Sequence, residues 1–281
     1  MKRILAFASI ALALSGQAFA ADLYQPEPVA APPAEPVVVA SSGWYLRGDL
    51  SYDFMDMRGA NYMRGTPQEK AWFKSADLDD TGNIGVGVGY QVNDYLRFDK
   101  TLDYMFSSDF RGSTTGGCGT VAGPCRSRDS ASMSAYSLMA NAYVDLAHYG
   151  AVTPYVGVGL GATRIQWDDL KNTSCSSSNP NACDPTVTHK GKDSWRFTYG
   201  LMAGAAIDVT CQLKADVGYR FRHVNDGPMF GSRYGAGNGR DEGFNIHEVR
   251  TGLRYSLDDS ACQQAYMPPA ELPNQPQPVF K

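Results

Sequence analysis

Apolar and polar side chains alternate along most of the chain between residues 43 and 257. The clearest run covers residues 245–257. Two sets of residues alternate in it. The mostly apolar set is Val249, Thr251, Leu253, Tyr255 and Leu257, and the mostly polar set is Glu248, Arg250, Gly252, Arg254 and Ser256. Successive side chains of a strand point to opposite faces of a sheet, so this run predicts a strand with one apolar and one charged face.

Seven earlier runs repeat the pattern, at 44–54, 84–92, 96–106, 136–146, 153–163, 195–209 and 213–222. Long polar segments at 56–81, 107–131, 166–193 and 224–243 alternate with short ones near 93–94, 148–150 and 210–212. Such sorting of connections is typical of outer-membrane barrels with long outer loops and short periplasmic turns. We therefore predict an all-β fold, an eight-stranded antiparallel up-and-down transmembrane β-barrel.

The apolar face of such a barrel must meet lipid, because eight strands leave an interior only wide enough for side chains. The inward positions carry both signs of charge, which predicts an ion network in the lumen: Arg47, Asp49, Asp53, Arg97, Asp99, Asp103, Asp145, Arg196, Asp208, Lys214, Asp216, Arg220, Glu248, Arg250 and Arg254. A plug that holds the barrel together is the favoured interpretation, and an ion path is the alternative. Lys100 does not fit this pattern, because its parity predicts a lipid-facing position for a charged side chain. It could snorkel, face another subunit or mark a bulge.

The ends of the chain have a different composition. Lys2 and Arg3 precede a short apolar run at 4–14, and small residues follow at 18–20, so residues 1–20 are predicted to be a signal peptide and the mature chain to start at Ala21. Residues 21–42 are predicted to be a Pro-rich periplasmic linker, 43–257 the barrel, and 258–281 a Pro-rich C-terminal tail. No stretch approaches the roughly 20 apolar residues of a membrane helix.

Charge and cysteine content narrow the chemistry. The net charge of −4, which becomes −6 without Lys2 and Arg3, argues against a nucleic-acid partner. Six cysteines in an exported chain predict disulfides, and the topology puts them on matching sides as three pairs: Cys118 with Cys125, Cys175 with Cys183, and Cys211 with Cys262. No metal or cofactor is expected.

Histidines give the only candidate for catalysis. His223 and His247, near Asp226 and Glu248, are the one group that an outer-membrane protease or lipid A-modifying enzyme could use. No Ser-His-Asp or metal spacing accompanies them, so the chain is predicted not to be an enzyme.

The chain resembles the small eight-stranded outer-membrane barrels of the opacity-protein and OmpA-like membrane-domain type, above all the major surface antigens of alphaproteobacteria. The resemblance is carried by the mature start Ala21-Asp22, the Pro-rich spacer, the opening GWYLRG at 43–48 and the periodic glycines. It implies the outer membrane of a Gram-negative bacterium as the location. It also implies that Arg250, Gly252, Tyr255 and Leu257 form a last-strand signal for the barrel-assembly machinery, although here the chain continues beyond Leu257.

The resemblance further implies a structural surface protein that contributes to envelope integrity in contact with outer-membrane lipid and lipopolysaccharide. Loop cations are the candidate phosphate partners: Arg58, Arg64, Lys70 and Lys74. In some members of this family the Ala-Asp start is joined to peptidoglycan through its free amine, which here would make Ala21 the attachment residue; the alternative is an ordinary cleavage site followed by a disordered segment. A small porin-like channel is the alternative function.

Overall fold

A computed structural model describes residues 42–64, 69–231, 238–258 and 262. The predicted signal peptide, the attachment residue Ala21, nearly all of the linker and most of the C-terminal tail lie outside these residues. The described residues contain no helix that is long and apolar enough to cross a membrane.

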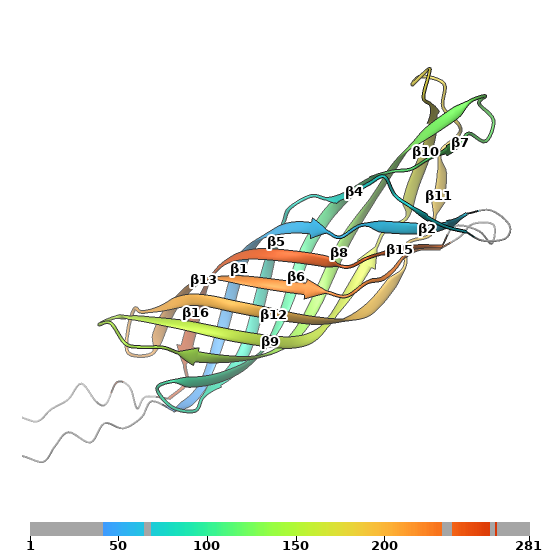
Figure 1. Ribbon diagram of the computed structural model, residues 1–281. Coiled ribbons are helices and arrows are strands. Elements are labelled where there is room, and N and C mark those ends of the chain that lie inside the picture. Colours follow the sequence, from blue (N-terminus) through green and yellow to red (C-terminus); the bar gives the residue numbers. More distant parts are fainter. Residues whose placement is uncertain (1–41, 65–68, 232–237, 259–261, 263–281) are drawn as a thin grey trace, which may run out of the picture. The chain divides into compact units, whose positions relative to one another are not determined.

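Long antiparallel strands organise the chain (Figure 1). They are β1 (Gly43–Met57), β5 (Thr81–Gln91), β6 (Leu96–Ser113), β8 (Pro124–Asp145), β9 (Val152–Trp167), β12 (Asp193–Asp208), β13 (Leu213–Val224) and β16 (Phe244–Ser256). The pairings run from β8 through β9, β12, β13, β16, β1, β5 and β6 and then return to β8. We call these the circuit strands. Each predicted run falls within one of them or ends one residue beyond it, so the prediction of an antiparallel all-β fold is confirmed.

The connections between circuit strands differ at the two ends of the sheet. Tight turns join β5 to β6, β8 to β9 and β12 to β13, and we call this the turn end; β1 begins and β16 ends here too. In two of these turns a backbone N–H closes the chain onto itself, from Val92 to Leu96 O at 2.8 Å and from Val209 to Leu213 O at 2.9 Å. The third contains Gly150 at φ 61°, which a residue without Cβ adopts at little cost. The opposite end is the loop end.

The two faces of the circuit strands differ in exposure as the alternation predicts. Apolar side chains of the outer face are exposed, with Val86 at 58%, Leu160 at 59% and Val217 at 50%. On the inner face Arg97, Arg220 and Glu248 are fully buried. The face that a soluble protein would hide is therefore the one turned outward.

The segments predicted as polar loops are largely β-structure, which corrects the sequence prediction. They contain β2 (Ala60–Arg64), β3 (Glu69–Trp72), β4 (Ser75–Leu78), β7 (Thr115–Gly117), β10 (Leu170–Ser176), β11 (Val187–His189), β14 (Gly227–Phe230) and β15 (Gly239–Asp241). In addition, β6 and β8 continue pairing beyond their predicted ends, out to Gly112 opposite Asp129, after a register shift between Met105 and Ser108. Their alternation persists with small polar residues in several of the buried positions, among them Ser108, Ser127 and Asp129, so the sequence shows no continuous apolar face there.

The loop end also has an apolar core, although an interior filled by ion pairs was predicted. Its buried members are Ala60, Leu78, Met105, Phe110, Met133, Ala135, Ile165, Trp167, Leu170, Val224, Met229, Phe230, Phe244 and Ile246. Some belong to circuit strands and others to β2, β4, β10 and β14. Phe110 is fully buried and meets Trp167 edge to face at 5.7 Å between ring centroids. The loop segments thus fold onto the circuit strands as a packed cap.

Truncation of Phe110 tests this core. Phe110→Ala is expected to lower the free energy of unfolding by about 3–5 kcal/mol, because the cap cannot collapse fully around the cavity. The measurement is the urea midpoint of the protein folded in detergent micelles. Tyr149→Ala is the control, since Tyr149 is 71% exposed in the turn between β8 and β9; equal losses in the two variants would contradict a packed cap.

Candidate functional site: the charged inner face

Arg220 and Arg222 on β13 join four strands across the inner face. Arg220 Nη2 lies 2.6 Å from Glu248 Oε2 on β16 and 3.2 Å from Asp103 Oδ1 on β6. Arg222 pairs with Glu248 at 2.8 Å and with Asp53 on β1 at 3.5 Å. All five side chains are buried. Two cations thus face three carboxylates in this group.

A second group lies nearer the turn end and centres on Arg47. Its two terminal nitrogens pair with Asp49 and with Asp99 on β6, each at 2.7 Å. Arg250 on β16 pairs with the same Asp49 at 3.2 Å. The Asn141 amide on β8 donates to the second oxygen of Asp99 at 2.7 Å. These contacts tie β1, β6, β8 and β16 together at one level.

Aromatic rings complete the filling close to the turn end. Arg97 pairs with Asp145 at 3.2 Å, and its guanidinium carbon lies 4.1 Å from the Tyr143 ring centroid and 4.5 Å from that of Tyr155. A guanidinium over an aromatic face is attracted by the ring quadrupole, and the attraction grows when water is excluded. Arg97 is therefore held by one carboxylate and two rings.

Arg254 forms a similar site beside it. Its Nε lies 3.6 Å from Asp216 Oδ2, and its guanidinium carbon is 5.4 Å from the Tyr45 ring centroid. The Tyr45 hydroxyl donates to Asp99 at 3.1 Å, which links this site to the group around Arg47.

Three residues predicted for the network lie elsewhere. Asp208 and Lys214 pair with each other at 2.6 Å at the turn end, with side chains 38% and 30% exposed. They have inward parity, but they sit beside the turn at 209–212, where the strands leave the packed interior. Arg196 is buried, yet it pairs with Asp241 of β15 at 2.5 Å and so anchors the cap.

The inward tyrosines Tyr45, Tyr143 and Tyr155 are absent from the predicted ion network, which contains only charged residues, although their rings contact its arginines. Tyr45 lies opposite Gly89 and Tyr143 opposite Gly157 in the strand registers. A Cβ on Gly157 would come 2.5 Å from the Tyr143 ring, so the glycine provides the space that the ring occupies. An aromatic residue of inward parity opposite a glycine is the signal that could have identified these two.

The proposed assembly residues have definite places on β16. Arg250 is the partner of Asp49, and Gly252 lies opposite Asp49, where a Cβ would be 2.6 Å from Gly48 O. Tyr255 and Leu257 project from the outer face. Arg250 and Gly252 thus contribute to interior packing, and their recognition by assembly machinery stays a prediction.

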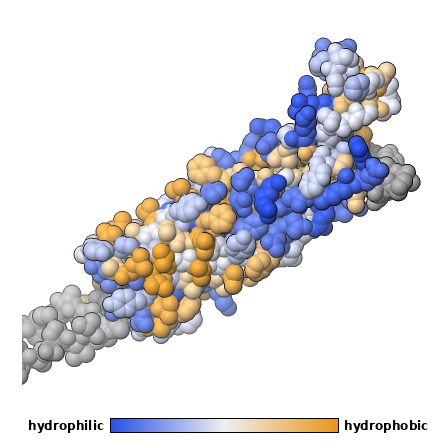
Figure 2. Space-filling view, viewed as in Figure 1, coloured by the Kyte–Doolittle hydropathy of each residue, from blue (hydrophilic) through white to orange (hydrophobic). Residues whose placement is uncertain are grey.

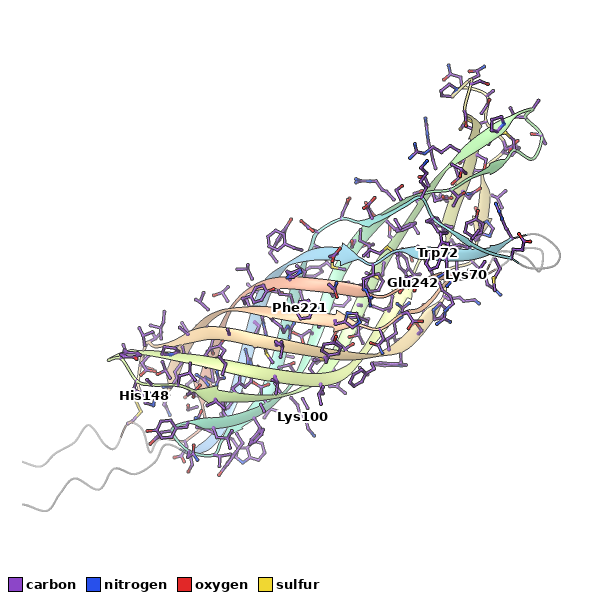
Figure 3. All side chains as sticks on the ribbon, in the orientation of Figure 1. Lys70, Trp72, Lys100, His148, Phe221 and Glu242 are labelled. Atoms are coloured by element: carbon purple, nitrogen blue, oxygen red, sulfur yellow. A yellow bond between two sulfur atoms is a disulfide. The ribbon has the colours of Figure 1, made fainter. Side chains whose placement is uncertain are left out.

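Lys100 is exposed on the outer face, as its parity predicts (Figure 3). It lies between Val88 on β5 and Ala140 on β8, and both registers are continuous there. The register shift of β6 comes further along, between Met105 and Ser108. A bulge at Lys100 is therefore the wrong explanation, and snorkelling or contact with another subunit remain as the alternatives.

The histidines do not converge on a catalytic arrangement. His247 Nδ1 lies 2.5 Å from the Tyr219 hydroxyl on the outer face, whereas the neighbouring Glu248 points inward. His223 Nδ1 lies 2.8 Å from Asn245 Oδ1. Asp226 pairs with Arg240 at 2.7 Å. These residues belong to separate contacts.

Two disulfides brace the loop end and one the turn end. Cys118 is bonded to Cys125, Cys175 to Cys183, and Cys211 to Cys262. These are the pairs that the sequence predicts.

A carboxylate connects the two disulfide-bonded segments of the loop end. Asp184 accepts hydrogen bonds from the backbone of Gly119 at 2.6 Å, Thr120 at 2.8 Å and Val121 at 3.1 Å. These bonds stabilise the charged carboxylate and hold the pKa of Asp184 well below its ordinary value.

The predicted loop cations are dispersed. Lys70 on β3 lies 4.2 Å from the Trp72 ring centroid and 3.5 Å from Glu242 Oε1 (Figure 3). Arg58, Arg64 and Lys74 make no ion pair among the residues described. Arg64 and Lys70 lie on the paired strands β2 and β3, whereas the Lys74 backbone N–H donates to Ser113 O at the end of β6 at 2.7 Å.

Removing a central cation tests the network. Arg220→Gln is expected to destabilise the folded protein by about 3–5 kcal/mol, because Asp103 and Glu248 lose a buried partner. Lys214→Gln, which breaks an exposed pair, should cost about 0–1 kcal/mol. Urea unfolding in micelles measures both. A double-mutant cycle with Glu248→Gln checks the pair: strictly additive losses from Arg220→Gln and Glu248→Gln would contradict the assignment.

Asp184→Asn tests the contact between the loop segments. At neutral pH it should speed hydrogen exchange several-fold at the amides of Gly119, Thr120 and Val121. In the unsubstituted protein this protection should be fully present above about pH 4, the ordinary Asp pKa, and should be lost as the pH falls through the lower folded value. Asp226→Asn is the control, because Asp226 pairs with Arg240 instead. Unchanged exchange in Asp184→Asn would show that the contact does not hold the turn.

Comparisons with known proteins assign the family. The model of the outer membrane protein beta-barrel domain matches residues 7–256. An uncharacterized protein of Brucella suis is 39% identical over 274 residues, covering 85% of this chain and 93% of the relative. An opacity protein of Neisseria gonorrhoeae is 25% identical over 240 residues, covering 76% of this chain and 96% of the relative.

Among solved structures, OprG of Pseudomonas aeruginosa matches with a TM-score of 0.49 and 14% identity, over 78% of this chain and 97% of that one. The predicted location is confirmed as the outer membrane of Gram-negative bacteria, and the chain belongs to the outer-membrane β-barrel family.

Proposed function

We propose that the circuit strands form a closed eight-stranded transmembrane barrel that serves as a structural protein of the cell envelope. The turn end would face the periplasm and the loop end the outside, as in outer-membrane barrels generally. The observation that carries this proposal is the filled inner face.

The filling consists of charge at one level and apolar side chains at the next. Arg97, Arg220 and Arg222 are at most 1% exposed, and the apolar core of the cap lies beyond them. An ion crossing this interior would have to separate buried pairs, and each broken pair costs several kcal/mol. These facts favour a plug over the small porin-like channel.

The outer face supports insertion into a bilayer. Aromatic side chains occur at two levels of the circuit strands. Trp44 and Tyr90 meet at 5.2 Å near the turn end, and Tyr104 and Tyr136 at 4.7 Å toward the loop end. Aromatic girdles at the two interfaces and an apolar band between them are characteristic of outer-membrane barrels.

The position of β1 supports a tether to peptidoglycan. β1 starts at Gly43 on the turn end, which is the end that we assign to the periplasm. In an extended proline conformation residues 21–42 would reach on the order of 60 Å. A free α-amino group on Ala21 would be partly unprotonated near neutral pH. It could attack a peptide carbonyl of the cell wall and form a new amide as the amine originally bonded to that carbonyl leaves.

Mass spectrometry of peptidoglycan digests tests the tether. The expected product is a muropeptide joined to the Ala21-Asp22 terminus. Its absence would contradict the tether while leaving the barrel assignment intact. The plug is tested separately by planar-bilayer recording, where the purified protein should give no discrete conductance steps.

A further inference from the structure

A large cleft lies at the loop end between the extensions of β6, β8 and β10. It has a volume of about 1160 Å³ and is also lined by residues before β4 and by the Cys175–Cys183 disulfide. Figure 2 shows hydrophilic residues gathered over this end of the sheet, whereas hydrophobic ones dominate toward the turn end. The cleft belongs to neither the ion network nor the apolar core.

Five cations line the cleft: Lys74, Arg111, Arg126, Arg128 and Lys171. The strand registers put four of them, all except Lys74, on one face. Lys171 on β10 and Arg111 on β6 both lie opposite Ser130 on β8, while Arg128 lies opposite Thr173 on β10. Arg126 and Arg128 are two residues apart on β8 and so project from the same side. Positive charge is thus concentrated across three neighbouring strands.

Carboxylates neutralise part of this charge, on the side of Arg111 and Lys171: Asp77 lies opposite Arg111 in the strand register, and Asp109, Asp168 and Asp169 line an adjoining pocket with both cations. Arg111 pairs with Asp79 at 2.5 Å, but Lys74, Arg126, Arg128 and Lys171 make no ion pair among the described residues. Asp129 is the one acid in the lining.

Asp129 is already occupied by other contacts. Its carboxylate accepts from Ser127 at 2.5 Å and from Asn172, and burial raises its pKa. Cations that gather without counter-charges repel each other, and a bound anion would relieve that repulsion.

The rest of the lining can recognise hydroxyl-rich ligands. Serine and threonine side chains occur on each contributing segment, among them Ser75, Ser113, Thr115, Ser130, Thr173 and Thr186. A hydroxyl both donates and accepts, which suits sugar hydroxyls, whereas arginine suits the oxygens of sulfate or phosphate groups.

We propose that this cleft binds a polyanionic saccharide that carries sulfate or phosphate esters. The proposal rests on the outward orientation of the loop end given above. The cleft residues on β8 run from Arg126 to Ser130, ten to six residues before Tyr136 of the outer aromatic level, which is about 20–33 Å along the strand. That distance separates the cleft from lipid headgroups and favours a glycan outside the protein's own bilayer. Of the loop cations predicted from the sequence, only Lys74 lines it.

The disulfides give the site a fixed shape. Cys175 and Cys183 line the cleft directly, and Asp184 next to them holds the turn at 119–121. A site that is organised before binding loses less conformational freedom when the ligand arrives.

The test is calorimetric titration of the full mature chain, folded in micelles, with a defined heparin hexasaccharide. The variant Arg126→Gln/Arg128→Gln/Lys171→Gln should bind about tenfold more weakly or worse, because several charge-assisted hydrogen bonds are lost. Affinity should also fall with added salt.

The control variant is Lys190→Gln/Lys192→Gln/Arg240→Gln, which removes the same charge from positions outside the cleft. It should keep the original affinity. Equal loss in both variants, or no binding by the original chain to either this ligand or the second one below, would overturn the proposal.

The second ligand is a deacylated lipopolysaccharide core oligosaccharide, which carries phosphate in place of sulfate. Cleft-dependent binding of heparin alone supports a sulfated external glycan as the source. Cleft-dependent binding of the core oligosaccharide alone supports the cell's own surface sugars. Heat-modified electrophoretic mobility, measured on each variant, separates a failed site from a failed barrel.

Discussion

Burial of charge on the inner face is the constraint on which the structure depends. A guanidinium removed from water is tolerated only when carboxylates, amides or rings surround it, and here these come from different strands. Arg220 requires β6 and β16, whereas Arg47 requires β6 and its own strand. Interior contacts therefore help to determine which strands become neighbours, in addition to the backbone hydrogen bonds between them.

The same constraint accounts for the two-level interior. Charge occupies the part of the inner face that we assign to the membrane, where the outer face must be apolar. Beyond Met105 the surroundings of the strands change, and the inner face becomes the apolar core of the cap. The half that we assign to the membrane thus has a charged interior and an apolar exterior. The cap has an apolar interior, as soluble proteins do.

Alternation along the sequence predicted the circuit strands because parity alone decides which face a side chain takes. The alternation of side chains does not show how far along the strand direction a residue lies from the turns. It therefore predicts Asp208 and Lys214 in the network, although they lie beside a turn. It also cannot predict that β2, β4 and β14 fold back over the strand ends, since their apolar residues are buried by partners distant in the chain. The basic cleft was missed for the same reason, because its cations come from three strands that only the fold brings together.

The tyrosine rings that lie over inward glycines restrict which substitutions these paired positions can accept. Tyr45 covers the backbone of Gly89, and Tyr143 that of Gly157, so each ring fills the volume that its partner leaves vacant. Enlarging one member would have to be matched by shrinking the other. We therefore expect positions 45 and 89, and likewise 143 and 157, to change together when such barrels diverge. A smaller side chain at the tyrosine position should accompany a larger one at the glycine position.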